Sequence, residues 1–253
     1  MKTVSIVQSN YIPWKGYFDI IGLSDEFILF DTVQYTRRDW RNRNHIKVAA
    51  GDSWLSIPVK TRGLYDQTIQ HTEISDPSWA EKHWAKLQSV YRGLDGFKLY
   101  APAIQKTYEE AASKTHLSAV NRLFIERICG LLGIDTVISN ASDYPAQDGK
   151  TERLVGLCKE VGANRYISGP AAAVYIEAEQ FAASAIDLVY MDYSGYPEYS
   201  QVNPPFQHGV SVLDLLFSVG DAAPQYMKFK STIWPQAVWT ARPNPVFPKP
   251  SPA

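Results

Sequence analysis

The chain has little of several features that assign proteins to common classes. It has only two cysteines among 253 residues, Cys129 and Cys158, which excludes a disulfide framework and a cysteine-built zinc site and favours a reducing compartment. No apolar run approaches the roughly 20 residues of a membrane span, and no signal-peptide pattern is present, so we expect a cytoplasmic protein. Positive charge is not in surplus either. A net charge of −1 argues against a protein that coats nucleic acid.

Familiar catalytic and cofactor motifs are missing as well. There is no Gly-x-Gly-x-x-Gly loop and no Walker lysine motif, which disfavours the usual NAD and ATP sites. The five histidines show no paired ligand spacing, so we predict no metal site. No Gly-x-Ser-x-Gly elbow marks a serine nucleophile. The sequence therefore indicates no particular cofactor.

The apolar content of 45% can supply a proper core, and its pattern predicts an α/β fold. Short β-branched or apolar runs alternate with helical segments, as in parallel sheets with right-handed crossovers. We expect a Rossmann-like, nucleotidyltransferase-like parallel sheet with a short antiparallel hairpin and a helical insertion. The predicted strands cover residues 3–7, 26–31, 136–139, 165–168 and 186–191, and helices cover 17–23, 117–132, 150–162 and 210–218.

The remaining segments complete one predicted domain over residues 1–225. Residues 45–48 and 53–59 flank Gly51-Asp52 and read as the antiparallel hairpin. Residues 78–132 are mainly helical. We interpret residues 226–253 as a Pro-rich C-terminal tail, extended or partly disordered.

The loop Gln8–Tyr17, QSNYIPWKGY, is the first candidate for chemistry. It follows the first strand, and open parallel sheets place ligands at the C-terminal ends of their strands. Its Pro-x-x-Gly-aromatic turn resembles the Pro…His-x-Gly-His loop of nucleotidyltransferases, but Trp14 and Tyr17 replace the histidines, which weakens adenylyl transfer as the chemistry. The alternative is a loop that merely joins strand to helix.

The basic stretch Gln34–Lys47, QYTRRDWRNRNHIK, is the second candidate. It contains four arginines and follows the predicted strand end at Asp31, on the same sheet edge as the first loop. Whether it is helical or extended, we expect several guanidinium groups to converge there on a phosphate or carboxylate. A solvated charged face is the alternative, although such a face seldom includes Trp40 and two asparagines.

Two segments of the second half could also face a ligand. After the strand that ends in Ser168-Gly169, the run AAAVYI predicts a helix whose N–H groups would face a ligand, or whose small residues allow close packing. The Pro-rich segment 196–211 could form a lid, in which His208 is a possible general base or, alternatively, a surface or capping residue. Ser211 is predicted to cap the following helix.

Together these stretches resemble the WbqC-like protein family. The matching pieces are QSNYIPWKGYFDII, LFDTVQYTRRDWRNRNHIK, TERLVGLCKEVGANRYISGPAAAVYI and YPEYSQVNPPFQHGVSVLDLLFSVG, in the family's order, with a mild departure at Ser9, where the family commonly has proline. The resemblance implies a cytoplasmic protein linked to O-antigen, other surface-polysaccharide or natural-product pathways. The resemblance also implies a set of substrate-binding residues, at the positions of this chain that match the family's motifs. These residues are Gln8, Asn10, Tyr11, Trp14, Tyr17, Gln34, Tyr35, Arg38, Trp40, Asn42, Arg43, Lys47, Ser168, Gly169, Tyr175, Tyr199 and Gln201.

The leading hypothesis is a transferase of polysaccharide or specialised-metabolite biosynthesis that acts on a phosphate-bearing donor. The donor would be a nucleotide sugar or an acyl thioester, the latter with an acyl carrier protein as partner. In this hypothesis Arg38, Arg43 and Lys47 hold the anionic group, and Asp31 or His208 accepts the proton. The alternative is a non-catalytic module that binds a nucleotide sugar or a pathway partner; single-stranded nucleic-acid binding is disfavoured by the net charge.

Overall fold

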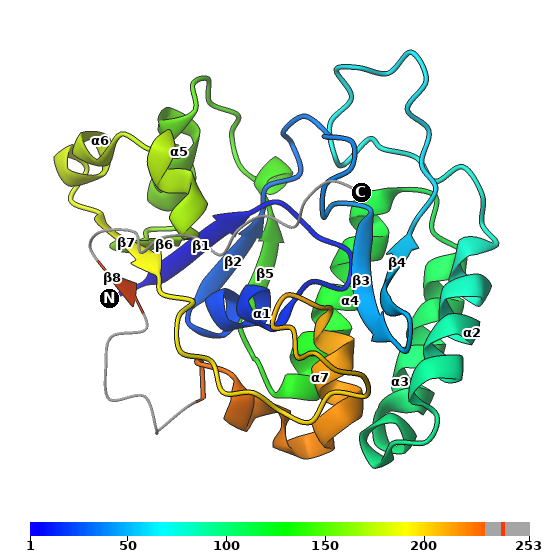
Figure 1. The fold of residues 1–253 in the computed structure, drawn as a ribbon. Helices are drawn as coiled ribbons and strands as arrows, with labels where there is room; N and C mark the ends of the chain where they lie inside the picture. Colours follow the sequence, from blue (N-terminus) through cyan, green and yellow to red (C-terminus); the bar gives the residue numbers. More distant parts are fainter. Residues whose placement is uncertain (231–238, 241–253) are drawn as a thin grey trace.

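A five-stranded parallel sheet forms the centre of the computed structural model, which describes residues 1–230 and 239–240. The strand order is β5-β2-β1-β6-β7, and the short β8 (Trp239–Thr240) pairs antiparallel with β7 at one edge (Figure 1). The α/β class and the parallel sheet predicted from the sequence are confirmed. The parallel strands are β1 (Thr3–Val7), β2 (Glu26–Leu29), β5 (Val137–Asn140), β6 (Arg165–Ser168) and β7 (Asp187–Met191).

Strand β1 lies in the middle of the sheet and pairs on both sides. Its Val4 is opposite Glu26 of β2 on one side and Tyr166 of β6 on the other. The chain first builds the sheet outward through β2, adds β5 beyond it, and then returns to place β6 on the opposite side of β1. The strand order therefore reverses between β1 and β6, and such a reversal leaves a crevice at the C-terminal ends of the two strands.

Helices cover the two faces of the sheet with separate cores. On one face α5 (Thr151–Glu160) and α6 (Ala178–Ala183) pack through residues such as Leu154 and Phe181. The other face carries a larger core that also joins the helical insertion to the sheet (Figure 1). Its helices are α1 (Lys15–Gly22), α2 (Trp79–Tyr91), α3 (Asp95–Ala112), α4 (Leu117–Leu132) and α7 (Val212–Val219).

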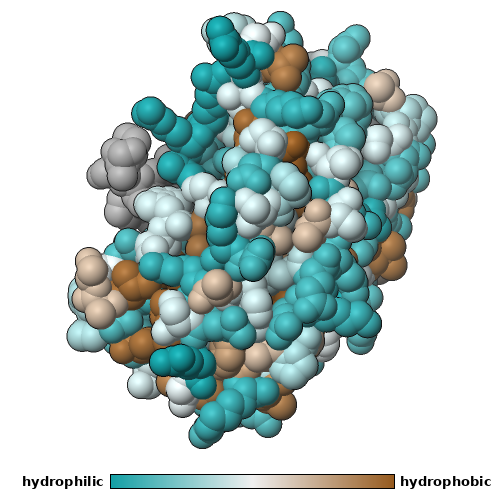
Figure 2. All heavy atoms as spheres, turned by 90° about the vertical axis from the view of Figure 1, so that its right-hand side faces the viewer, coloured by the Kyte–Doolittle hydropathy of each residue, from teal (hydrophilic) through white to brown (hydrophobic). Residues whose placement is uncertain are grey.

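The predicted hairpin is also present, as β3 (Arg43–Val48) and β4 (Gly51–Ser56). Gly51 has a φ of 113°, a backbone conformation that residues with a Cβ rarely adopt. The glycine therefore allows the tight turn that connects β3 to β4. Asn44 of β3 donates to the carbonyl of Ile12 at 2.8 Å, which ties the hairpin to the loop after β1. Figure 2 shows the face on which the hairpin and α2 lie; hydrophilic side chains predominate there and apolar ones are scattered.

Most predicted elements are confirmed, some with shifted ends. The strand 3–7, the strand 165–168 and the helix 117–132 have the predicted bounds, and Ser211 accepts a hydrogen bond from the Leu213 N–H as the expected helix cap. The helix predicted for AAAVYI is wrong. Pro170–Val174 forms only a 3₁₀ turn, because the chain then becomes extended at Glu177 and turns Ile176 into the core before α6 begins. Two further 3₁₀ turns cover Ala141–Asp143 and Gly220–Tyr226.

The interpretation of a C-terminal tail rests mostly on residues that lie outside the described part of the chain. Within the described part, Met227 is buried in the larger core, and β8 extends the sheet. Among the described residues, no helix combines the length and the apolar character needed to cross a membrane.

Candidate functional site

The candidate site lies at the reversal of strand order, where the loops after β1 and β6 begin. Gln8, Ser9 and Asn10 follow β1, Ser168 ends β6, and Gly169 follows it. Because parallel strands have their carboxyl ends at one edge of the sheet, the two loops must lie next to each other. The basic stretch crosses the same edge, since the Tyr11 N–H donates to the Trp40 carbonyl at 3.1 Å. The predicted meeting of the first loop with the basic stretch is therefore confirmed.

Arg41 is the basic residue that enters this loop. Its Nη1 donates to the Gln8 carbonyl at 3.2 Å, to the Ser9 carbonyl at 3.4 Å and to the Asn10 side-chain oxygen. Its Nη2 lies 3.6 Å from Asp39, which is itself one-third exposed. Only 12% of the Arg41 side chain is exposed. A largely desolvated guanidinium thus stands at the crevice and is held mainly by neutral oxygens.

The loop that carries Gln8–Asn10 rests on side chains from the end of β2 and from α4. The Ser9 N–H donates to Asp31 Oδ1 at 2.8 Å, and the Ser118 hydroxyl donates to Asp31 Oδ2. Asn121 of α4 donates at 2.9 Å both to the Ser9 hydroxyl and to the Arg41 carbonyl. Both oxygens of Asp31 are therefore occupied in holding the loop, and this residue is only 4% exposed.

Two tyrosines lie close to Arg41. Tyr17 donates to the Gln8 carbonyl at 3.0 Å from inside the core, and burial raises its pKa well above the ordinary value, with Asp31 adding to the rise. Tyr175 is 49% exposed and follows the β6 loop. Burial raises its pKa, whereas the Arg41 charge lowers it. Tyr175 is therefore half-exposed and lies within reach of the Arg41 charge.

The structure does not bring the other basic residues of the stretch to this point. Arg38 is exposed, and its φ of 57° lies in the left-handed region. Arg43 lies 4.3 Å over the ring of Trp54 and donates to the Arg38 carbonyl at 2.7 Å. Lys47 is 1% exposed and points to Asp52 at 3.6 Å. The expected convergence of several guanidinium groups is wrong, and Arg41 alone of the four arginines contacts the Gln8–Asn10 loop.

Several predicted substrate-binding residues lie away from the crevice. Tyr11 is fully buried and pairs with His83 at 2.9 Å and with Tyr108 at 2.7 Å. The others support the hairpin and its neighbourhood: Gln34 donates to the Tyr65 carbonyl, Tyr35 is buried, Asn42 donates to the Ile57 carbonyl, and Trp40 packs against His45 and Trp54.

Tyr199 and Gln201 belong to a buried network around Asp214 of α7. Asp214 accepts from Tyr199 at 2.8 Å, from Gln201 at 3.0 Å and from Tyr91 at 2.7 Å. Burial raises the pKa of Asp214, while these hydrogen bonds and the charge of Lys47 lower it. The network joins α2, α7 and the segment that precedes α7.

Lys15 forms a second buried cluster beneath that same segment. It is 2% exposed, and its Nζ lies 4.6 Å from the centre of the Tyr196 ring and 5.3 Å from that of Tyr199. Burial lowers the pKa of Lys15 to about 8, against the opposing effect of Asp19. His208 lies close by; burial first and the Lys15 charge second lower its pKa to about 4. Trp14 packs edge-on against Tyr193 and Tyr196.

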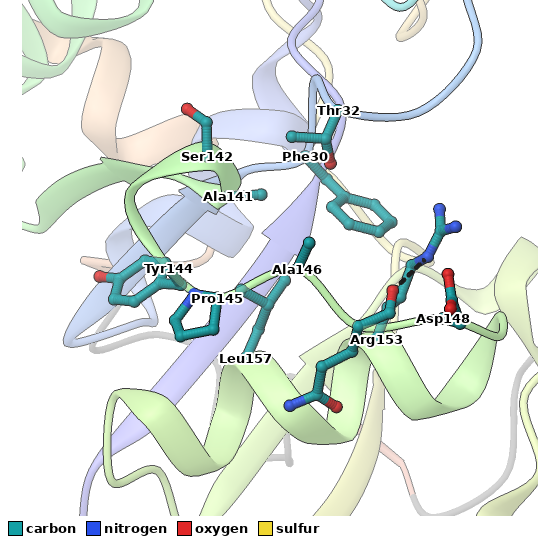
Figure 3. Close-up of a pocket in the computed structure, with 11 residues that line it drawn as sticks. Phe30, Thr32, Ala141, Ser142, Tyr144, Pro145, Ala146, Asp148, Arg153 and Leu157 are labelled. Atoms are coloured by element: carbon teal, nitrogen blue, oxygen red, sulfur yellow. Dashed lines mark hydrogen bonds between the residues drawn. The ribbon is translucent and has the colours of Figure 1, made fainter.

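A hollow of about 270 Å³ opens on the sheet edge beside the candidate site. Figure 3 shows the Phe30 ring projecting into it from the end of β2, opposite the segment Tyr144–Ala146 that follows β5. The start of α5 closes the far side. The residues that line the hollow are Phe30, Thr32, Ala141, Ser142, Tyr144, Pro145, Ala146, Gln147, Asp148, Arg153 and Leu157.

Four residues that are prominent in the structure lie outside the predicted substrate-binding and catalytic sets. Arg41 lies within the predicted basic stretch but outside the predicted binding set, and Lys15, Asp214 and Tyr196 are assigned to no site. A signal existed for Lys15, because a lysine inside the apolar run IPWKGYF is poorly placed for a surface residue. No local pattern distinguishes Arg41 from its three neighbours.

The described residues offer little for a metal or a thiol nucleophile. Within residues 1–230 and 239–240, no three His, Cys, Asp or Glu side chains group as metal ligands. Burial raises the pKa of Cys129 and of Cys158 to about 12, so neither thiol ionises readily near neutral pH.

The comparisons with known proteins agree with the sequence resemblance. The model of the WbqC-like protein family matches residues 8–226. A curated protein of Mycobacterium tuberculosis (strain ATCC 25618 / H37Rv), named "Uncharacterized protein Rv1507c", is 45% identical over 229 residues, which are 90% of this chain and 99% of that protein. No solved structure gave a significant match. The matched range includes Arg41 and the loops on both sides of the crevice.

Proposed function

The chain belongs to the WbqC-like protein family, and on that premise we propose that it is a transferase of surface-polysaccharide (O-antigen) or specialised-metabolite biosynthesis. Its substrate is a phosphate-bearing donor, either a nucleotide sugar or an acyl thioester delivered by an acyl carrier protein. The name of the M. tuberculosis relative assigns no activity, so the support for this proposal comes from the chemistry of the crevice.

The observation that carries the proposal is Arg41 at the reversal of strand order. Its guanidinium is largely withdrawn from water, and its ion pair with the partly exposed Asp39 is long, at 3.6 Å. Charge that is held mainly by neutral oxygens is poorly compensated, and a phosphate group would compensate it with strong, charge-assisted hydrogen bonds. Open α/β sheets bind their ligands at this position.

The neighbouring residues have distinct roles in this proposal. Gln8 and Asn10 hold the guanidinium through their oxygens, and the half-exposed side chain of Tyr175 contacts the bound donor from the β6 side. Asp31 fixes the loop rather than accepting a proton, because both of its oxygens are occupied. His208 remains the proposed proton acceptor; with its pKa lowered to about 4 it is neutral at pH 7, and the same low pKa makes it a weaker base than an ordinary histidine.

A non-catalytic binding module is the second candidate, and one observation favours it. The carboxylate that touches the candidate loop, Asp31, is fully engaged, whereas group transfer to a hydroxyl or amine needs a base close to the acceptor. Native mass spectrometry distinguishes the two functions. A transferase converts the bound donor when acceptors are supplied, and a binding module releases it unchanged.

Calorimetry with a panel of nucleotide sugars and acyl thioesters tests the anion site, with Arg41→Ala compared to Arg38→Ala as the matched control. Hydrogen bonds to charged groups contribute about 1.5–3 kcal/mol, so Arg41→Ala should weaken donor binding by about 10-fold to 150-fold. Arg38→Ala should change it by less than about 3-fold, because Arg38 is exposed. If Arg38→Ala weakens binding and Arg41→Ala does not, the site lies on the outer part of the basic stretch and the assignment to the crevice is wrong.

A further inference from the structure

The hollow shown in Figure 3 has no role in the anion site just described, although it shares the same edge of the sheet. Its walls come from three elements that are far apart in the sequence: the end of β2, the turn after β5 and the first turns of α5. Phe30 is half-buried and packs against the core on the α5 face, so this wall is fixed by the fold.

Backbone contacts place the hollow directly beside the loop that holds Arg41. The Phe30 N–H donates to the Val7 carbonyl at 3.0 Å, so the backbone of Phe30 lies next to the last residue of β1, where the loop after β1 begins. Thr32, on the rim of the hollow, follows Asp31, which binds the Ser9 N–H. Neighbouring strands lie about 4.8 Å apart. The gap between β5 and β2 is therefore separated from the gap between β1 and β6 by two strand spacings, about 10 Å.

The lining combines flat apolar faces with polar groups at the mouth. Phe30, Pro145 and Leu157 supply the apolar surface, and the Thr32 and Ser142 side chains add hydroxyl groups. At the mouth, Arg153 donates from Nε to the Gln147 carbonyl at 2.8 Å, which fixes the guanidinium beside Asp148 (Figure 3). A planar heterocycle uses both kinds of group, because its faces stack and its edge carries hydrogen-bond donors and acceptors.

We propose that this hollow binds the nucleobase of a nucleoside diphosphate donor whose phosphates lie at Arg41. The inference rests on the proposed function and narrows it, because it selects a nucleotide sugar over an acyl thioester as the donor. A ribose bridges the separation between the two subsites. A phosphopantetheine arm would be a poorer occupant, since a flexible chain without a ring gains little from the stacking faces.

Binding of four probes to the full chain tests this assignment: inorganic pyrophosphate, 4′-phosphopantetheine, UDP and ADP. The key variant is Ala146→Trp, because Ala146 is exposed and lines the hollow, so a large ring there fills the space without removing core packing. Ala183→Trp is the size-matched control, since Ala183 is exposed on α6 and does not line the hollow. Phe30→Ala is a second variant that enlarges the hollow and removes the stacking face.

We expect at least one of the two nucleotides to bind at least 10-fold more tightly than pyrophosphate. Ala146→Trp and Phe30→Ala should abolish that advantage while leaving the affinity for pyrophosphate within about 2-fold, and Ala183→Trp should leave both unchanged. If pyrophosphate binds through Arg41 but neither nucleotide binds more tightly, the nucleobase subsite is wrong and the proposed function stands. A phosphopantetheine advantage lost in Ala146→Trp would also overturn it, in favour of an acyl donor. If none of the four probes binds, the proposed function fails as well.

Discussion

Replacement of Asp214 by alanine should strongly destabilise the protein. The side chain is fully buried and accepts hydrogen bonds from Tyr91 at 2.7 Å, Tyr199 at 2.8 Å and Gln201 at 3.0 Å. Hydrogen bonds to a charged acceptor contribute about 1.5–3 kcal/mol each. The three hydrogen bonds share one carboxylate, and removing this carboxylate also removes the cost of burying its charge. The free energy of unfolding should therefore fall by less than the sum of the three bonds, by about 3–5 kcal/mol.

Urea unfolding followed by tryptophan fluorescence measures this loss. With a slope of about 3 kcal/mol per molar urea for a domain of this size, the midpoint should fall by about 1–1.7 M. Asp214→Asn should lose less, about 1–2 kcal/mol, because its amide oxygen still accepts from Tyr199 and Gln201 and the Tyr91 hydroxyl can rotate to accept from its nitrogen.

Ser218→Ala on the same helix is the matched control. The Ser218 hydroxyl is buried without a hydrogen-bond partner among the described residues, so its removal should change the free energy of unfolding by no more than about 0.5 kcal/mol. If Asp214→Ala shifts the midpoint no further than Ser218→Ala does, the three hydrogen bonds do not stabilise the fold and the reasoning is refuted.

Two further changes test the buried charges. Burial lowers the pKa of Lys15 from 10.5 to about 8, so below pH 8 its charge opposes folding, and this penalty disappears as the pH rises from about 8 to 10.5. Lys15→Met should therefore stabilise the protein at pH 7 by up to about 3 kcal/mol, reduced by the energy of the lost cation–π contacts, and this gain should shrink above pH 8. If the variant is instead less stable at pH 7, the contacts of Lys15 with Tyr196 and Tyr199 outweigh the cost of burying its charge. Asp31→Asn should lower stability by about 1–3 kcal/mol and weaken pyrophosphate binding, because it disturbs the hydrogen bonds from Ser9 and Ser118 that hold the loop; unchanged stability together with lost turnover would instead make Asp31 the proton acceptor.

The sheet could be predicted from the sequence because its signals are local. The run Thr3–Val7 is rich in β-branched residues and is buried on both faces, so it is recognisable as a short buried strand. Gly133 adopts the left-handed conformation that ends α4 at its predicted residue. The run AAAVYI misled the prediction because helix propensity is a weak preference, and packing of Ile176 into the core overrides it.

The choice among the arginines could not be made from the sequence for a definite physical reason. Both a helix and an extended chain give a regular alternation of side chains, and the prediction assumed one or the other. Arg38 instead has a φ of 57°, so the chain reverses direction at that residue and no regular period applies on either side of it. Arg41 reaches the crevice through this turn, whereas Arg43 belongs to the first strand of the hairpin.

The loop after β1, which forms the candidate site, is attached to the hairpin as well as to the central sheet. Trp40 and Asn44 bind the backbone of Tyr11 and Ile12, yet neither residue belongs to the central sheet. Substitutions, insertions or changes of twist in the hairpin can therefore move Arg41 and the Gln8–Asn10 loop while the strands and their register stay as they are. Divergence of ligand preference among related chains can therefore proceed through the exposed positions of the hairpin, while Ile46 and Leu55, which are buried in the larger core, stay unchanged.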